Sequence, residues 1–144
     1  MTMEAKPFQI LLAEDRPEDA ELVRQALKEH NVQCTLHVIR DGAEAIEFID
    51  SLDSAPHSPP LDLCLVDMHL PKCGGEDILK RLRSTEHYAQ TPVIVMSGIS
   101  AAHIEETAAK HAGLLFFQKP STLDEYLRLG SIVRNLLPKR AGAA

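Results

Sequence analysis

The sequence predicts a three-layer α/β sandwich, in which helices cover both faces of one parallel, five-stranded sheet. Five short apolar runs alternate with five segments of helical periodicity along the chain. The apolar runs show little polar alternation, which is typical of strands that are buried on both faces. No internal repeat or linker divides the 144 residues, so we expect one domain.

The first half of the chain already shows this alternation. FQILLA at 8–13 predicts the first strand, and Pro17 stands where the first turn of the following helix is expected. CTLHVI at 34–39 predicts the second strand, and the next helix opens at Asp41-Gly42. The segment 51–60, SLDSAPHSPP, is expected to be a proline-rich surface loop.

The second half continues in the same way. The expected elements are a strand at 61–66, a helix after Gly74-Gly75, a strand at 92–96, an alanine-rich helix at about 101–111, a strand at 114–117 and a helix at 122–137. Because crossovers between parallel strands are right-handed, a flavodoxin-like (βα)5 fold with strand order 2-1-3-4-5 is expected. Residues 1–6 would then be an N-terminal extension, 7–137 the domain, and 138–144 a short tail without an output domain.

Composition excludes several classes of protein. With 15 basic and 21 acidic residues the net charge is −6, which argues against direct DNA binding. No apolar run approaches the roughly 20 residues of a membrane span, and the N-terminus lacks the apolar core of a signal peptide. The three cysteines have no metal-ligand spacing and fit a reducing compartment. We therefore expect a cytoplasmic protein.

Polar side chains follow four of the expected strands, at the edge where parallel sheets bind ligands. Glu14 and Asp15 follow the first strand, Asp67 the third, Ser97 the fourth and Lys119 the fifth. Three carboxylates would repel one another unless a cation lay among them, and hard oxygen ligands suit Mg²⁺. Asp67 could then stay ionised and attack an electrophilic phosphorus, while Lys119 and Ser97 stabilise the transferred group. Taken singly, Asp67 could cap a turn and Ser97 a helix, but the combination favours a site.

These stretches resemble a known family, the receiver domain of two-component response regulators. The motifs are LLAED at 11–15, LVDMHLP at 65–71 followed by Gly75, VIVMSG at 93–98 and FFQKP at 116–120. The resemblance implies a phosphoacceptor in signalling, and not an enzyme, which takes a phosphoryl group from a sensor histidine kinase or a phosphotransfer protein. The cofactor it implies is Mg²⁺, with Mn²⁺ as a possible substitute.

The resemblance also implies a role for each site residue. Asp67 would be the phosphoacceptor, and the metal would be held by Glu14, Asp15, Asp67 and the main-chain carbonyl of His69. Glu14 departs from the family pattern, in which Asp is commoner at this position. His69 overlooks the acceptor and is expected to influence the rate of dephosphorylation.

Three more roles concern the ends of the fourth and fifth strands. Ser97 matches the family's switch hydroxyl, Lys119 its lysine and Phe116 its switch aromatic residue. Phe116 lacks the hydroxyl of the frequent Tyr, so its switching would be a change of packing alone. The bond between Lys119 and Pro120 would be the family's cis peptide bond.

The last helix has more apolar residues than a single stripe requires. We expect Leu123 and Leu127, with residues further along, to pack onto the sheet, which leaves Tyr126, Leu129 and Leu136 partly exposed for a partner. The alternative is a wider core contact. The family mechanism implies that the fourth helix–fifth strand–fifth helix face binds a downstream protein or a second copy of the chain. The DRPED sequence at 15–19 is similar to single-domain regulators paired with phytochrome-type sensor kinases.

Other functions would use the same fold. A Mg²⁺-dependent aspartyl-phosphate phosphohydrolase would require a second acid two residues after Asp67, where this chain has His69. A flavodoxin-like cofactor binder would require glycines or hydroxyls in the first strand–helix turn, which reads EDRPED. A receiver-like scaffold that does not accept phosphate is the third alternative.

Overall fold

One parallel sheet forms the middle layer of the protein. The computed structural model describes residues 6–55, 61–68, 70, 72, 74–98 and 114–138. The strands are β1 (Phe8–Ala13), β2 (Cys34–Ile39), β3 (Leu63–Asp67), β4 (Val93–Ser97) and β5 (Leu114–Gln118). All pairings are parallel, in the order β2-β1-β3-β4-β5. The predicted fold class and strand order are therefore confirmed.

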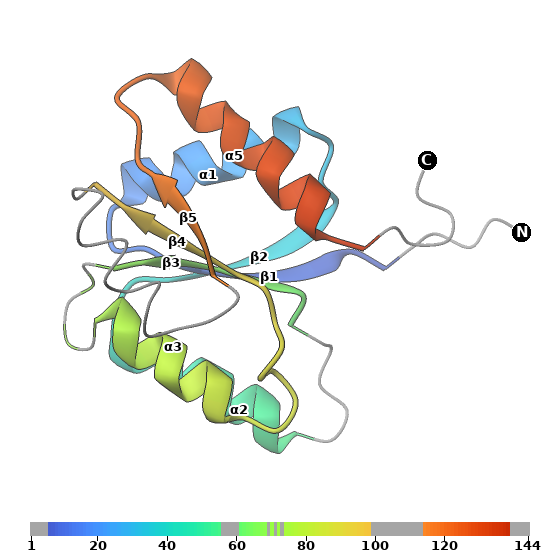
Figure 1. Ribbon diagram of the computed structural model, residues 1–144, viewed down its shortest axis with the longest axis vertical. Coiled ribbons are helices and arrows are strands. Elements are labelled where there is room, and N and C mark those ends of the chain that lie inside the picture. Colours follow the sequence, from blue (N-terminus) through green and yellow to red (C-terminus); the bar gives the residue numbers. More distant parts are fainter. Residues whose placement is uncertain are drawn as a thin grey trace, which may run out of the picture.

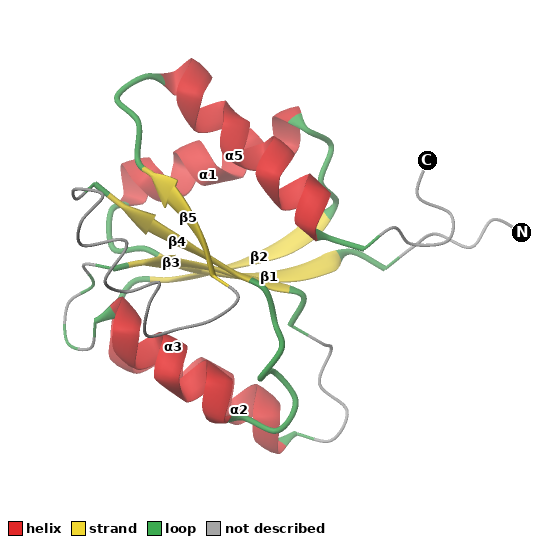
Figure 2. Ribbon diagram, viewed as in Figure 1, coloured by secondary structure: helices red, strands yellow, loops and turns green. Residues whose placement is uncertain are grey.

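Helices cover both faces of this sheet. They are α1 (Pro17–Glu29), α2 (Gly42–Ser54), α3 (Gly75–Ser84) and α5 (Leu123–Leu136). Figure 1 shows α1 and α5 together on one face and α2 and α3 on the other, and Figure 2 shows the same three layers by element type. The predicted helix at about 101–111 lies outside the described residues. No helix in the described ranges is long and apolar enough to cross a membrane.

The end of α2 differs from the prediction. The segment 51–60 was expected to be a loop, but α2 continues through Ser54. The hydroxyls of Ser51 and Ser54 donate to the carbonyls of Phe48 and Ser51, so both serines bond to their own helix instead of ending it. Residues 56–60, which include the prolines, lie outside the described part.

Two apolar cores lie on the two faces of the sheet. Along β1, Ile10 and Leu12 belong to the core under α1 and α5, whereas Leu11 and Ala13 belong to the core over α2 and α3. Every residue of β3 and β4 is buried. Burial on both faces explains why the strands appear in the sequence as nearly continuous apolar runs.

The helix starts are adapted to the carboxyl ends of the strands. Pro17 stands in the first turn of α1, and Asp41 caps α2 by accepting a hydrogen bond from the Glu44 N–H at 2.8 Å. A Cβ at Gly75 would lie 2.8 Å from the Asp67 carbonyl oxygen, so glycine allows α3 to begin directly against the end of β3.

The buried face of α5 follows the alternative considered from the sequence, a wider core contact, for two of the three residues proposed as a partner face. Tyr126 and Leu129 are 2% and 0% exposed and belong to the core, and Leu136 is half-buried. Leu123, which was expected to pack onto the sheet, is instead 48% exposed. The reason lies at Gly130, where an added Cβ would collide with the Ala26 carbonyl of α1. Glycine allows the two helices to approach closely, and this approach turns the Tyr126 stripe inward.

Candidate functional site

The ammonium group of Lys119 lies at the centre of an acidic cluster. Its Nζ is 2.8 Å from Glu14 Oε2, 3.0 Å from Asp19 Oδ2 and 3.1 Å from Asp67 Oδ2. These distances are typical of charge-assisted hydrogen bonds. The four side chains come from the end of β1, the first turn of α1, the end of β3 and the residue after β5. Parallel pairing brings these distant parts of the chain to one edge of the sheet.

Burial and the neighbouring charges shift the pKa values of Glu14 and Lys119 in opposite directions. The Glu14 side chain is fully buried and that of Asp67 is 7% exposed. Burial raises the pKa of Glu14 to about 7, although its hydrogen bond with Lys119 acts in the opposite direction. Burial alone would lower the pKa of Lys119, but the bonds with Glu14 and Asp19 outweigh it and raise that pKa above its usual value. Lys119 therefore stays charged, and three acids share one cation.

The cluster has the oxygen ligands that a divalent cation requires. Glu14, Asp15 and Asp67 each place a carboxylate oxygen so that the three atoms lie within 4.8 Å of one another. Asp15 is the most exposed of the three, whereas Glu14 and Asp67 are buried. A site made of carboxylates fits Mg²⁺ or Mn²⁺, and a bound cation would balance the charge that Lys119 leaves unpaired. His69, whose carbonyl was predicted as a further ligand, lies outside the described residues.

Ser97 and Phe116 lie on the same face of the sheet. Ser97 ends β4, is 1% exposed, and its main-chain carbonyl accepts a hydrogen bond from the Lys119 N–H at 2.9 Å. Phe116 pairs with Val95 in the β4–β5 register and is half-buried against the core over α2 and α3. Since Val95 and Ser97 are two residues apart, the Ser97 and Phe116 side chains project from the same face. Phe117 packs on the opposite face.

The peptide bond between Lys119 and Pro120 is trans, and no cis peptide bond occurs among the described residues. The prediction of a cis bond at this position is therefore wrong for this structure. A trans bond before proline is favoured by about 0.5–1 kcal/mol. Lys119 also reaches all three acids in this form, so the contacts of the cluster do not require the cis isomer.

Asp19 is the residue of the cluster that the sequence did not reveal. An acid in the first turn of a helix is usually explained by the helix dipole, and Asp19 fits that pattern. Its position five residues after Glu14, in the helix that leaves the strand end, is the one available signal. The structure shows that the Asp19 carboxylate also bonds to Lys119, and that Arg16 Nε lies 3.7 Å from Asp19 Oδ2.

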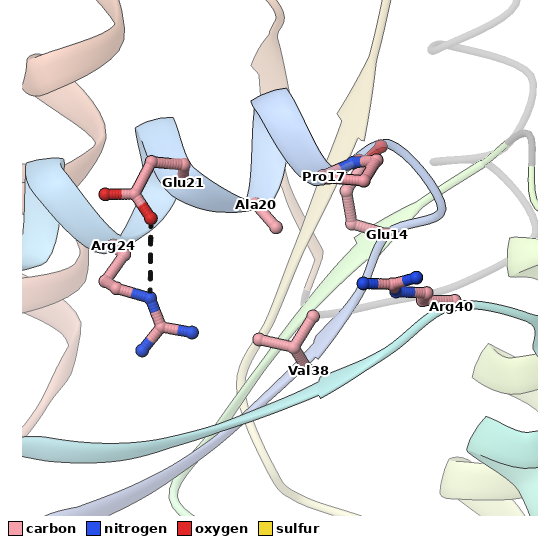
Figure 3. Close-up of a pocket in the computed structure, with 7 residues that line it drawn as sticks. All are labelled: Glu14, Pro17, Ala20, Glu21, Arg24, Val38 and Arg40. Atoms are coloured by element: carbon pink, nitrogen blue, oxygen red, sulfur yellow. Dashed lines mark ion pairs between the residues drawn. The ribbon is translucent and has the colours of Figure 1, made fainter.

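A small cavity of about 250 Å³ lies between α1 and β2, beside Glu14. Figure 3 shows Arg40 at the Glu14 end of this cavity and the ion pair of Arg24 with Glu21 at the other end. Its volume is below the roughly 300 Å³ at which ligand pockets usually begin. The cavity therefore does not favour the flavodoxin-like cofactor binder considered from the sequence.

Comparison with known families identifies the chain. The family model described as "Response regulator receiver domain" matches residues 10–129. The chain belongs to this family. Response regulator Rcp1 of Synechocystis sp. is 33% identical over 91 residues, which cover 63% of this chain and 62% of Rcp1. The transcriptional regulatory protein TrcR of Mycobacterium tuberculosis is 28% identical over 91% of this chain and 47% of TrcR. The chain thus spans less than two thirds of the length of these curated relatives.

Solved structures agree with this assignment. The phosphorylated cyanobacterial phytochrome response regulator RcpA superposes with a TM-score of 0.78 at 25% identity, over 92% of this chain and 94% of RcpA. The Mn²⁺-bound form of Rcp1 gives a TM-score of 0.77 at 26% identity, over 96% of this chain and all of Rcp1. Both the receiver-domain prediction and the similarity to phytochrome-associated regulators are confirmed.

Proposed function

We propose that this receiver domain accepts a phosphoryl group on Asp67, in a Mg²⁺-dependent reaction, from a histidine kinase or a phosphotransfer protein. The observation that supports this most strongly is the position of Asp67. Its carboxylate is bonded to the Lys119 ammonium at 3.1 Å and also lies within 4.8 Å of the other two potential metal ligands. A nucleophile, a fixed cation and a metal-binding pair are therefore adjacent.

The proposed transfer is a displacement at phosphorus. One Asp67 carboxylate oxygen forms a bond to phosphorus while the bond between phosphorus and the donor's imidazole nitrogen breaks, and the electron pair stays on that nitrogen. Charge spreads over the phosphoryl oxygens in the transition state and requires donors at fixed positions. Lys119 supplies one donor and the Ser97 hydroxyl a second. Mg²⁺, when bound by Glu14, Asp15 and Asp67, would neutralise part of this charge.

The signal would leave the domain through a change of packing. When Ser97 turns toward the phosphoryl group, the half-buried Phe116 on the same face can move into the vacated space. The surface around β5 and the start of α5 would then shift its population of conformers. Leu115 and Leu123, at 42% and 48% exposure, replace Tyr126 and Leu129 as candidates for apolar contact with a downstream protein or a second copy.

The similarity to Rcp1 and RcpA supports a more specific donor. RcpA is a phytochrome response regulator, so we propose a phytochrome-type sensor kinase as the source of the phosphoryl group. The transfer would take place in the cytoplasm. Purified kinases of this type, compared with kinases of other sensor classes at equal concentration, would test this part separately from the phosphorylation chemistry.

Intact-mass spectrometry after incubation with acetyl phosphate tests the proposed function. We expect a gain of one phosphoryl group with Mg²⁺, none with EDTA, and none in Asp67→Asn. Asp62→Asn is the matched control, because Asp62 bonds to the main-chain N–H of Gln9 at 2.7 Å and is not part of the cluster. A scaffold would give no adduct from acetyl phosphate or from any kinase. An adduct from a kinase alone would indicate a receiver that selects its donor.

A further inference from the structure

The hydroxyl group of Tyr126 is a buried donor without a partner among the described residues. Tyr126 is 2% exposed, and its ring makes an edge-on contact with Phe117, with 5.7 Å between ring centroids. A tyrosine hydroxyl that is buried this deeply normally makes a hydrogen bond. Phenylalanine at position 126 could pack against Phe117 in the same way, so the contact of the ring does not explain why a hydroxyl is present.

The Tyr126 side chain extends toward the end of the sheet that holds the acidic cluster. Helices α1 and α5 follow the ends of β1 and β5 at the carboxyl edge of the sheet and cross each other obliquely on one face (Figure 1). Gly130 of α5 lies against Ala26 of α1, where an added Cβ would collide with the Ala26 carbonyl. Tyr126 lies one turn closer to the start of α5, and long helical side chains point toward the start of their helix. This direction leads to the first turn of α1, which contains Asp19.

Electrostatics agrees with this direction. Burial raises the pKa of Tyr126, and among the charged groups the Asp19 carboxylate raises it most, while Lys119 lowers it. The hydroxyl therefore lies within the field of the cluster, with Asp19 as its strongest acidic neighbour. The Asp19 side chain is itself 17% exposed and accepts from Lys119 Nζ at 3.0 Å, so the acid that acts most strongly on the hydroxyl is already bonded to the ammonium.

We propose that Asp19 is a positioning residue that exchanges partners, bonding to Lys119 in the unphosphorylated domain and to the Tyr126 hydroxyl once the ammonium turns toward a phosphoryl group on Asp67. The second half of this statement rests on the proposed function. Among the described residues the hydroxyl has no partner, and Lys119 is held among three acids. After the exchange, Asp19 keeps a donor, the hydroxyl gains an acceptor, and Lys119 is available to the phosphoryl oxygens.

The chain offers a clean spectroscopic test, because it has two tyrosines and no tryptophan. With tyrosine labelled at Cζ with ¹³C, NMR shows one signal from Tyr126 and one from Tyr88, which is buried in the other core and serves as the internal control. Lys119→Met removes the ammonium without any phosphorylation. We expect the Tyr126 signal to move downfield in this variant, to stay in place in Lys119→Met/Asp19→Ala, and the Tyr88 signal to remain unchanged in both.

Beryllofluoride with Mg²⁺ then tests the link to phosphorylation, and it uses the wild-type chain. Its binding should move the Tyr126 signal in the same direction as Lys119→Met does. Tyr126→Phe should bind beryllofluoride roughly 10- to 100-fold more weakly, the loss expected for one hydrogen bond to a charged group, with Mg²⁺ affinity unchanged.

The outcomes separate this inference from the proposed function. An unchanged Tyr126 signal in folded Lys119→Met overturns the exchange of partners. Beryllofluoride that binds the wild-type chain without moving the Tyr126 signal overturns its link to phosphorylation. If beryllofluoride does not bind the wild-type chain at all, the proposed function fails, and Lys119→Met alone decides whether the exchange exists.

Discussion

Replacing Lys119 by Met should destabilise the metal-free domain by about 2–3 kcal/mol near pH 7.5. Removing one partner from a buried ion pair typically costs about 3–5 kcal/mol, because the remaining charge is left unpaired. Two features reduce that figure here. Lys119 and Asp19 keep 16% and 17% of their side-chain surface exposed. Without the lysine, Glu14 also loses the hydrogen bond that lowers its pKa, so this buried carboxyl takes up a proton more easily and part of the unpaired charge disappears.

The sign of the pH dependence follows from the same groups. Protonation of Glu14 relieves the unpaired charge, so the difference in free energy of unfolding between wild type and Lys119→Met should grow from pH 6 to pH 8.5. Saturating Mg²⁺ should stabilise the variant more than the wild type, because the cation binds acids that no longer have the lysine as a partner. Urea denaturation followed by circular dichroism, with EDTA or with Mg²⁺, measures each value.

A surface lysine provides the matched control for this prediction. Lys80 is exposed on α3, so Lys80→Met should change the free energy of unfolding by less than about 0.5 kcal/mol. The reasoning is refuted if Lys119→Met is as stable as Lys80→Met in EDTA. It is also refuted if Mg²⁺ stabilises Lys119→Met no more than it stabilises the wild type.

Two further predictions concern parts of the fold away from the cluster. Gly130→Ala should lower the free energy of unfolding by about 1–3 kcal/mol, because the new Cβ meets the Ala26 carbonyl. This overpacking outweighs the gain in helix propensity of about 1 kcal/mol. An unchanged or higher midpoint of urea denaturation would show that α1 and α5 can move apart at little cost. His87 should titrate above 6.5 in NMR, because its hydrogen bond with Asp53, at 2.8 Å between Nδ1 and Oδ1, raises its pKa, and Asp53→Asn should lower that pKa toward the ordinary value. Because the pKa of His87 is raised, its stabilisation of the fold is present at low pH and is lost as the pH rises through that pKa. Equal His87 pKa values in wild type and Asp53→Asn would contradict the contact.

The control for Gly130→Ala lies on the same helix. Asn135 is exposed in α5, so Asn135→Ala tests helix propensity without any contact with α1. We expect Asn135→Ala to be as stable as the wild type or slightly more stable. A loss of stability in both variants would indicate an effect of the helix itself and not of the contact at Ala26.

Most of the fold, and every residue of the charged cluster except Asp19, could be predicted because they depend on local patterns. A strand that is buried on both faces needs apolar residues at nearly every position, and β3 and β4 meet that need throughout. Parallel pairing then brings the residue after each strand to one edge of the sheet. For this reason Glu14, Asp67 and Lys119 could be placed together before any contact was known.

The misplaced face of α5 and the missed Asp19 have a common cause, which is that helix packing cannot be derived from periodicity alone. The apolar residues of α5 form more than one stripe, and the choice between the stripes depends on the close contact of Gly130 with Ala26. Tyr126 and Leu129 were therefore placed on the wrong face. Asp19 was missed for a related reason, since its contact with Lys119 depends on how α1 leaves β1.

Locating the phosphoryl group within the chain tests the central claim most directly. After reaction with acetyl phosphate and Mg²⁺, borohydride reduction converts an aspartyl phosphate to homoserine, which fragment sequencing of the tryptic peptides identifies. We predict homoserine at position 67 alone, with none when EDTA replaces Mg²⁺. Homoserine at another aspartate, or a phosphoryl group that persists in Asp67→Asn, would contradict the assignment of Asp67 as the acceptor.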